Sequence, residues 1–158
     1  MEFIKNDLEP IKQWICDACG EIIPNAESGW LEWYRDILPD DEIGKNKGYR
    51  IVHHDSRCMY NARLLYKENK LTADMHLDHY VGHDGLVSLL SKVQYDTEEN
   101  NEELVEIIRR LHVPYFEEAR QLHHLAEEDG YFVGENEVTR YLTSTSKHIL
   151  NRYNKVSY

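Results

Sequence analysis

The most constraining feature of this chain is a Cys-x-x-Cys-Gly turn formed by Cys16, Cys19 and Gly20. A third cysteine, Cys58, lies downstream. Three cysteines are too few and too odd in number for the disulfide framework of a small secreted domain. Glycine accepts the backbone torsions of the turn, which lets the two sulfur atoms converge on one point. Zinc takes about four ligands in a tetrahedron and prefers thiolate and imidazole. The spacing therefore predicts one bound zinc ion.

The predicted ligands of this ion are Cys16, Cys19, His54 and Cys58. His54 is expected at the end of a strand, and Cys58 in the first turn of the following helix. His53 is the alternative fourth ligand, although it points to the opposite face if the strand persists. Four protein ligands leave no open coordination position, so we expect a structural zinc and no catalytic residue. The competing interpretation is that the cysteines are ordinary small apolar side chains.

The order of a Cys-x-x-Cys turn, a strand hairpin and a helix resembles the treble-clef class of zinc fingers. The resemblance covers residues 14–68. It implies a metal that is bound between the turn and the start of the helix. The chain departs from the commonest treble-clef pattern in two ways. A histidine stands where a second Cys-x-x-Cys is more usual, and 34 residues separate Cys19 from His54.

Residue patterns divide the chain into a strand-rich part and a helical part. Strand-forming residues predict strands at 30–34 and 49–53, and Asp55 or Ser56 is placed to cap a helix over 57–68. Apolar residues at helical spacing predict further helices at 86–93, 104–111, 114–130 and 138–156, with Asp84 as a possible cap of the first. The expected fold is α+β. A zinc-stabilised hairpin and helix in residues 1–70 pack on a bundle of about four helices in residues 71–158.

Acidic side chains outnumber basic ones by 29 to 18, which gives a net charge of −11. Residues 96–137 hold 13 of the acids and three bases. This balance disfavours binding to a phosphate backbone, which requires clustered Lys and Arg. It favours a protein partner with a basic surface, because complementary charge steers association. A merely solubilising acidic face is the alternative.

Residues 103–120 resemble a helix-turn-helix, which is the basis of an alternative DNA-binding function. In such a unit the second helix reads base edges in the major groove. Here its early positions carry Glu117 and Glu118, which repel phosphate. A plain helical hairpin uses the same apolar spacing, and we favour that interpretation.

A second group of potential ligands is formed by His76, Asp78, His79 and His83. It resembles the H-x-H-x-D-H motif of metallo-β-lactamase-type hydrolases, which implies a metal-dependent hydrolase as a further alternative. Asp74 stands where the first histidine of that motif belongs, and the chain is short for that fold. The simpler interpretation is a turn with exposed histidines that leads into the helix at 86–93.

Residues 77–120 are also vaguely similar to small uncharacterised bacterial and phage-type proteins, a resemblance that carries no activity. No apolar run approaches the length of a membrane span, and the first residues do not resemble a signal peptide. We therefore expect a cytoplasmic, non-enzymatic, zinc-stabilised regulator or inhibitor that binds another protein through its acidic face.

Overall fold

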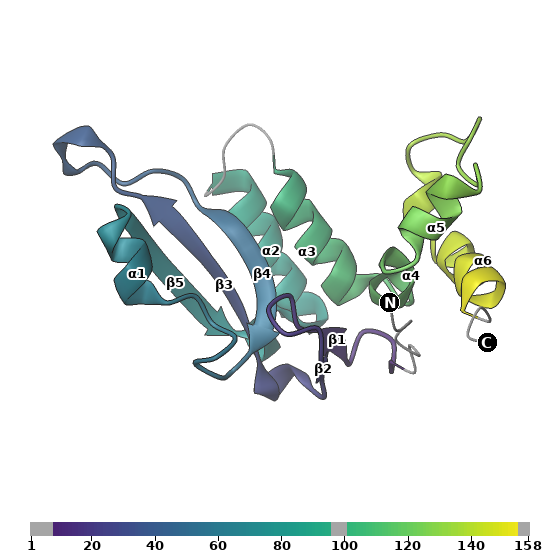
Figure 1. The fold of residues 1–158 in the computed structure, drawn as a ribbon, viewed down its shortest axis with the longest axis horizontal. Helices are drawn as coiled ribbons and strands as arrows, with labels where there is room; N and C mark the ends of the chain where they lie inside the picture. Colours follow the sequence, from purple (N-terminus) through teal and green to yellow (C-terminus); the bar gives the residue numbers. More distant parts are fainter. Residues whose placement is uncertain (1–7, 96–100, 155–158) are drawn as a thin grey trace.

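A computed structural model describes residues 8–95 and 101–154 and shows a mixed helix and strand fold (Figure 1). Two short strands, β1 (Trp14–Ile15) and β2 (Ile22–Ile23), form an antiparallel ribbon around the Cys-x-x-Cys turn. Trp14 lies opposite Ile23, and both are fully buried. The ribbon therefore anchors the turn to the core at its base.

A three-stranded antiparallel sheet follows, with strand order β4-β3-β5. Its strands are β3 (Gly29–Asp36), β4 (Lys47–His53) and β5 (Lys70–His76). β3 and β4 confirm the strands predicted at 30–34 and 49–53. β5 was not predicted, because its residues are half-buried or exposed and lack a run of large β-branched side chains. Its pairing with β3 extends the sheet to residue 76, beyond the expected segment boundary at residue 70.

The first α-helix follows β4 in the chain. They are α1 (Ala62–Lys67), α2 (Gly82–Tyr95), α3 (Glu102–His112), α4 (Phe116–Arg120), α5 (His123–Glu128) and α6 (Thr143–Tyr153). Short 3-10 turns lie between these elements: η1 (Ala26–Ser28), η2 (Pro39–Asp41), η3 (Leu77–Tyr80) and η4 (Thr139–Tyr141).

The helices predicted at 86–93 and 104–111 are confirmed as α2 and α3. The helix expected from residue 57 begins only at Ala62, where the Asn61 side chain accepts a hydrogen bond from Leu64 N. Asp84 does not cap α2 but lies within its first turn. The helix expected at 114–130 is split into α4 and α5.

Two hydrophobic cores divide the molecule differently from the expected four-helix bundle. α2 and α3 cover the sheet, and Leu89 and Ile107 belong to the same core as Leu31 and Ile51. α4, α5 and α6 form a second core, whose buried residues are Ala119, Leu122, Ala126, Ile149 and Tyr153. Figure 1 shows these three helices at the end of the molecule away from the sheet. The sheet has an apolar face that must be buried, and this explains why α2 and α3 pack on it.

None of the helices in the two described stretches is long and apolar enough to cross a membrane.

Candidate functional site

Four side chains gather at one end of the sheet: Cys16, Cys19, His53 and Cys58. Their ligand atoms all lie within 4.8 Å of one another, close enough to hold a metal ion. Cys16 and Cys19 come from the turn between β1 and β2, and His53 ends β4. Cys58 lies in the turn that precedes α1. The three predicted cysteines are therefore brought together, with His53 in place of His54.

The first two ligands are held by a tight turn. Cys16 N donates to Glu21 O at 2.9 Å, and Gly20 N donates to Cys16 O at 2.9 Å. Gly20 has a φ of 77°, in the left-handed region that glycine adopts without strain. The turn has the geometry that the Cys-x-x-Cys-Gly pattern predicts.

Asp17 docks this turn on the outer edge of β4. Its backbone N donates to Ile51 O at 2.8 Å, and its Oδ2 accepts from Ile51 N at 2.7 Å. His53 lies two residues after Ile51 and therefore on the same strand face. This docking brings the His53 ring to the two cysteines of the turn.

The His53 ring is oriented by a backbone carbonyl. Its Nε2 lies 3.1 Å from Ile22 O, so Nε2 carries the proton and donates. The other nitrogen, Nδ1, then presents its lone pair to the sulfurs, 3.4 Å from Cys19 Sγ and 3.8 Å from Cys58 Sγ. A carbonyl acceptor behind the ring is the usual arrangement for a metal-binding histidine.

His54 does not join the cluster. Its ring is exposed and lies edge-on to Trp30, with the centroids 4.6 Å apart, and 5.5 Å from the His76 ring. The two adjacent histidines face opposite sides, as expected, but the predicted ligand His54 is wrong and the alternative, His53, lies in the cluster. Ile51 and Val52 are both fully buried, so burial does not distinguish the two faces of the strand.

Cys58 reaches the cluster from a turn and not from a helix. Its backbone N donates to Asp55 O at 2.9 Å, and the Asp55 side chain accepts from Arg57 N at 2.9 Å. Arg50 Nη2 donates to the Cys58 carbonyl at 2.9 Å. Cys58 is therefore positioned by a closed turn four residues before the start of α1.

The pKa values of Cys16 and Cys58 are shifted in opposite directions. Burial raises the pKa of Cys16, but hydrogen bonds from the backbone of Cys19, His53 and Ala18 and from the His53 ring outweigh it and lower the pKa to about 7. Burial and the two neighbouring thiols raise the pKa of Cys58 to about 12. Three thiolates this close repel one another, so a cation between them stabilises the ionised cluster.

A cleft of about 780 Å³ opens beside the cluster. Cys19 is exposed on its wall, whereas Cys16 and Cys58 are buried. The cluster is therefore shielded by the core on one side and reachable from solvent on the other.

The second group of potential ligands does not converge. Within residues 8–95 and 101–154, the Cys16 cluster is the sole set of three or more such side chains close enough for one ion. The ring of His76 stacks on Trp30 with centroids 4.2 Å apart, and His79 packs edge-on against Tyr80. The positions of these histidines therefore do not favour the hydrolase interpretation.

The helix-turn-helix interpretation gains no support from the packing of α4. That helix has five residues, and Glu117 and Glu118 are only 2% and 3% exposed. The residues that would read bases are turned into the protein.

Glu117 instead joins a buried ion network that sequence patterns did not indicate. Arg110 Nη1 lies 2.7 Å from Asp17 Oδ2, and Arg110 Nε lies 2.7 Å from Glu117 Oε2. Glu117 Oε1 also accepts from Ile15 N at 3.0 Å. The network connects the cysteine turn with α3 and α4.

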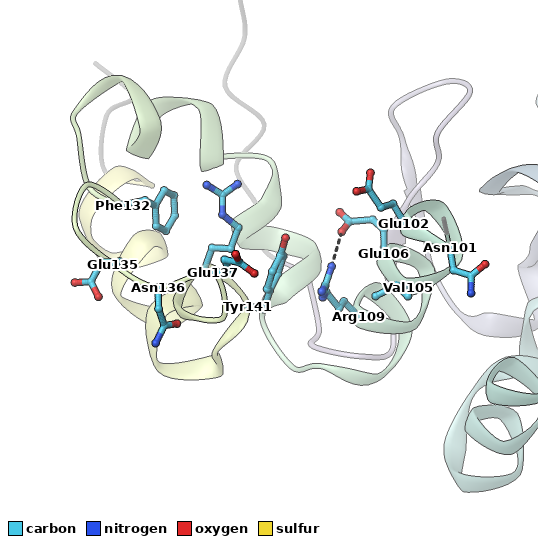
Figure 2. Close-up of a pocket in the computed structure, with 11 residues that line it drawn as sticks. Asn101, Glu102, Val105, Glu106, Arg109, Phe132, Glu135, Asn136, Glu137 and Tyr141 are labelled. Carbon is cyan, nitrogen blue, oxygen red and sulfur yellow. Dashed lines mark ion pairs between the residues drawn. The ribbon is translucent and has the colours of Figure 1, made fainter. Parts of the chain in front are cut away.

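Part of the acidic segment, residues 96–137, lines a cleft of about 880 Å³ between α3 and residues 132–141 (Figure 2). Its walls carry four glutamates: Glu102, Glu106, Glu135 and Glu137. Two arginines also line it. The Cζ atom of Arg109 lies 3.4 Å from the centre of the Tyr141 ring, and the Cζ atom of Arg140 lies 4.7 Å from the centre of the Phe132 ring. Residues 96–100 of the acidic segment lie outside the described residues.

No protein-family model matches this chain, and neither the curated proteins nor the solved structures include one that matches it.

Proposed function

We propose that this chain is a non-enzymatic, protein-binding regulator or inhibitor with one structural zinc ion bound by Cys16, Cys19, His53 and Cys58. The convergence of these four ligand atoms is the observation that carries the proposal. In a zinc tetrahedron with Zn–S of about 2.3 Å and Zn–N of about 2.0 Å, neighbouring sulfurs lie about 3.8 Å apart, and sulfur and nitrogen about 3.5 Å apart. The 3.4 Å and 3.8 Å separations at His53 Nδ1 fit this geometry.

The donor set favours a structural ion over a catalytic one. Three cysteines and a histidine complete the tetrahedral shell, so no position remains for water or substrate. The ion would join three segments of the chain: the turn after β1, the end of β4 and the turn before α1. Its binding energy would then contribute directly to folding, as in other small zinc-binding segments. The arrangement is in keeping with a treble-clef-like unit whose last ligand precedes the helix.

We assign the partner contact to the acidic cleft beside α3 (Figure 2). The two arginines that line the cleft, Arg109 and Arg140, are engaged by aromatic rings and by the carboxylates of Glu106 and Glu127. The remaining carboxylates make the cleft suited to a basic segment of a partner protein. Complementary charge of this kind raises the association rate and makes it sensitive to salt.

The metal and the cleft can be tested separately. Elemental analysis of the purified chain measures the zinc content, and about one ion per chain is expected. For the cleft, a variant carries Gln at positions 102, 106, 135 and 137. We expect it to retain its zinc and its fold but to lose the partner that the wild-type chain captures at low salt.

A matched control removes the same charge elsewhere. Asp40→Asn, Asp41→Asn, Glu42→Gln and Glu128→Gln change four exposed acids outside the cleft. This control should capture the partner as the wild type does. Equal loss of capture by both variants would show that only net charge matters, and full capture by the cleft variant would exclude the cleft as the contact.

A further inference from the structure

A second groove, of about 520 Å³, lies between α1 and β5, and its charge is opposite to that of the whole molecule. Its walls are Ala62, Arg63, Tyr66, Lys67, Lys70, Leu71 and Thr72. Three of these side chains are basic and none is acidic, in a chain whose net charge is −11. The groove therefore forms a local positive site on an acidic protein.

The two cations on α1 are placed unfavourably for the isolated protein. Arg63 and Lys67 are four residues apart, so they occupy the same helix face, where like charges repel. Lys70 is partly compensated, since its Nζ lies 3.5 Å from Glu68 Oε2 and 5.2 Å from the centre of the Tyr34 ring. An anion bound in the groove would remove the repulsion between Arg63 and Lys67.

The groove runs beside one edge of the sheet, the strand β5. The two edges differ in what contacts their outward-facing backbone groups. Along β4, the carboxylate of Asp17 accepts from Ile51 N, and that of Glu103 accepts from Gly48 N and Tyr49 N. These carboxylates occupy the outer edge of β4. β5 is the other edge strand, and no strand in the described part of the chain pairs with its outer side.

The groove also offers apolar contacts. Tyr66 is 63% exposed on α1, and Leu71 is half-buried on β5. An extended peptide presents alternate side chains to opposite faces, so it can place one set in a groove while its backbone pairs with an edge strand.

From these features we infer that the α1–β5 groove is a docking site for an extended acidic segment of a partner protein. The segment adds as a strand along β5, and its carboxylates pair with Arg63 and Lys67. The methylene groups of these acidic side chains contact Tyr66 and Leu71. This site is separate from the acidic cleft, and it takes a partner of the opposite charge.

The test uses the full chain, labelled with 15N, and the blocked peptide Ac-Glu-Val-Glu-Thr-Glu-Val-Glu-Thr-NH2. We expect saturable amide shifts in residues 62–76 and slower hydrogen exchange along β5. The same peptide with Lys in place of Glu should leave these amides unchanged. Binding of the acidic peptide should weaken with salt, because exposed charges are screened.

Charge reversal provides the matched pair of variants. Lys67→Glu should weaken peptide binding about tenfold, because an attraction is replaced by a repulsion of similar size. Lys45→Glu makes the same change of charge on an exposed residue outside the groove and should leave the affinity unchanged. The neutral Lys67→Gln variant, with an intermediate affinity, separates a charge effect from a folding defect.

Three results would overturn the inference. The first is an absence of shifts in residues 62–76 at saturating peptide. The second is equal weakening by Lys67→Glu and Lys45→Glu. The third is self-association in analytical ultracentrifugation that Lys67→Glu abolishes while the peptide fails to bind, which would assign the groove to a second copy of the chain. None of these results bears on the acidic cleft, whose test uses other residues and a partner of opposite charge.

Discussion

Arg110 and Glu117 form a two-point ion pair inside the protein, with Arg110 Nε 2.7 Å from Glu117 Oε2 and Arg110 Nη2 2.9 Å from Glu117 Oε1. Both side chains are only 2% exposed. Burial acts to lower the pKa of Arg110, but the charges and hydrogen bonds of Glu117 and Asp17 outweigh it and raise that pKa, so the guanidinium stays charged. The pair fixes the relative position of α3 and α4 where the two hydrophobic cores meet.

Removing one member of this pair should be costly. Arg110→Met removes the two-point partner of the buried Glu117 carboxylate and leaves it with the longer contact to Arg120 Nε, at 3.8 Å. Removing one partner of a buried ion pair costs about 3–5 kcal/mol. The measurement is urea unfolding at pH 7, monitored by tryptophan fluorescence. Arg109→Met, which removes a partly exposed arginine one position earlier, is the control. A loss of stability no larger for Arg110→Met than for Arg109→Met would contradict this account of the network.

Asp17 connects the cysteine turn to the rest of the molecule, so its loss should affect both stability and metal retention. Asp17→Ala leaves Ile51 N without its side-chain acceptor and removes one of the anions beside Arg110. Leaving such groups unpaired costs about 1–3 kcal/mol. We expect faster release of zinc to a chromophoric chelator than from the wild type. Asp78→Ala, an exposed aspartate in η3, is the comparison, and equal release rates for the two variants would disprove the role of Asp17.

Acid should destabilise the protein partly through His123. Burial, with Arg140 as the next largest cause, lowers the pKa of His123 to about 4, although Glu127 acts in the opposite direction. Histidine in an unfolded chain has a pKa of about 6.5. The unfolded state therefore binds more protons than the folded state between about pH 6.5 and about pH 4, and stability falls as the pH falls through this window.

A His123→Gln variant removes this titration. Its free energy of unfolding should depend less on pH between 6.5 and 4 than that of the wild type. His124→Gln, one residue on and exposed, serves as the control and should retain the wild-type dependence. Parallel pH profiles for all three proteins would show that His123 does not titrate as described.

Gly85 allows α2 to approach the turn before it. A Cβ atom at this position would lie 2.2 Å from the backbone carbon of Tyr80, so Gly85→Ala forces η3 and α2 apart. Overpacking of this kind costs about 1–3 kcal/mol. Thermal unfolding compares it with Ser91→Ala, an exposed substitution on the same helix. An unchanged or raised midpoint for Gly85→Ala would contradict the close contact of Gly85 with Tyr80.

The sequence predicted those parts of the fold that depend on residues close together in the chain. The Cys-x-x-Cys-Gly turn follows from glycine and spacing, and it leads to a cluster that can hold a metal. α2 and α3 follow from apolar periodicity, because each buries one face against the sheet.

The features that were missed depend on contacts distant in sequence. The choice of His53 depends on contacts across more than 30 positions of the chain. Asp17 docks the turn on Ile51, and Ile22 O accepts from His53 Nε2. The pairing of Arg110 with Asp17 spans 93 positions, and neither residue carries a pattern that indicates burial. The break between α4 and α5 lies within a continuous apolar pattern, so periodicity alone indicates one longer helix.

The most direct test of the account is the zinc content of the wild type, of two adjacent histidine variants and of Cys16→Ser. We predict about one zinc ion per chain for the wild type and for His54→Ala, because His54 packs on Trp30 outside the cluster. His53→Ala and Cys16→Ser should lose the ion and unfold at lower temperature. A well-folded wild-type chain without metal, or loss of zinc on His54→Ala but not on His53→Ala, would contradict the central claim.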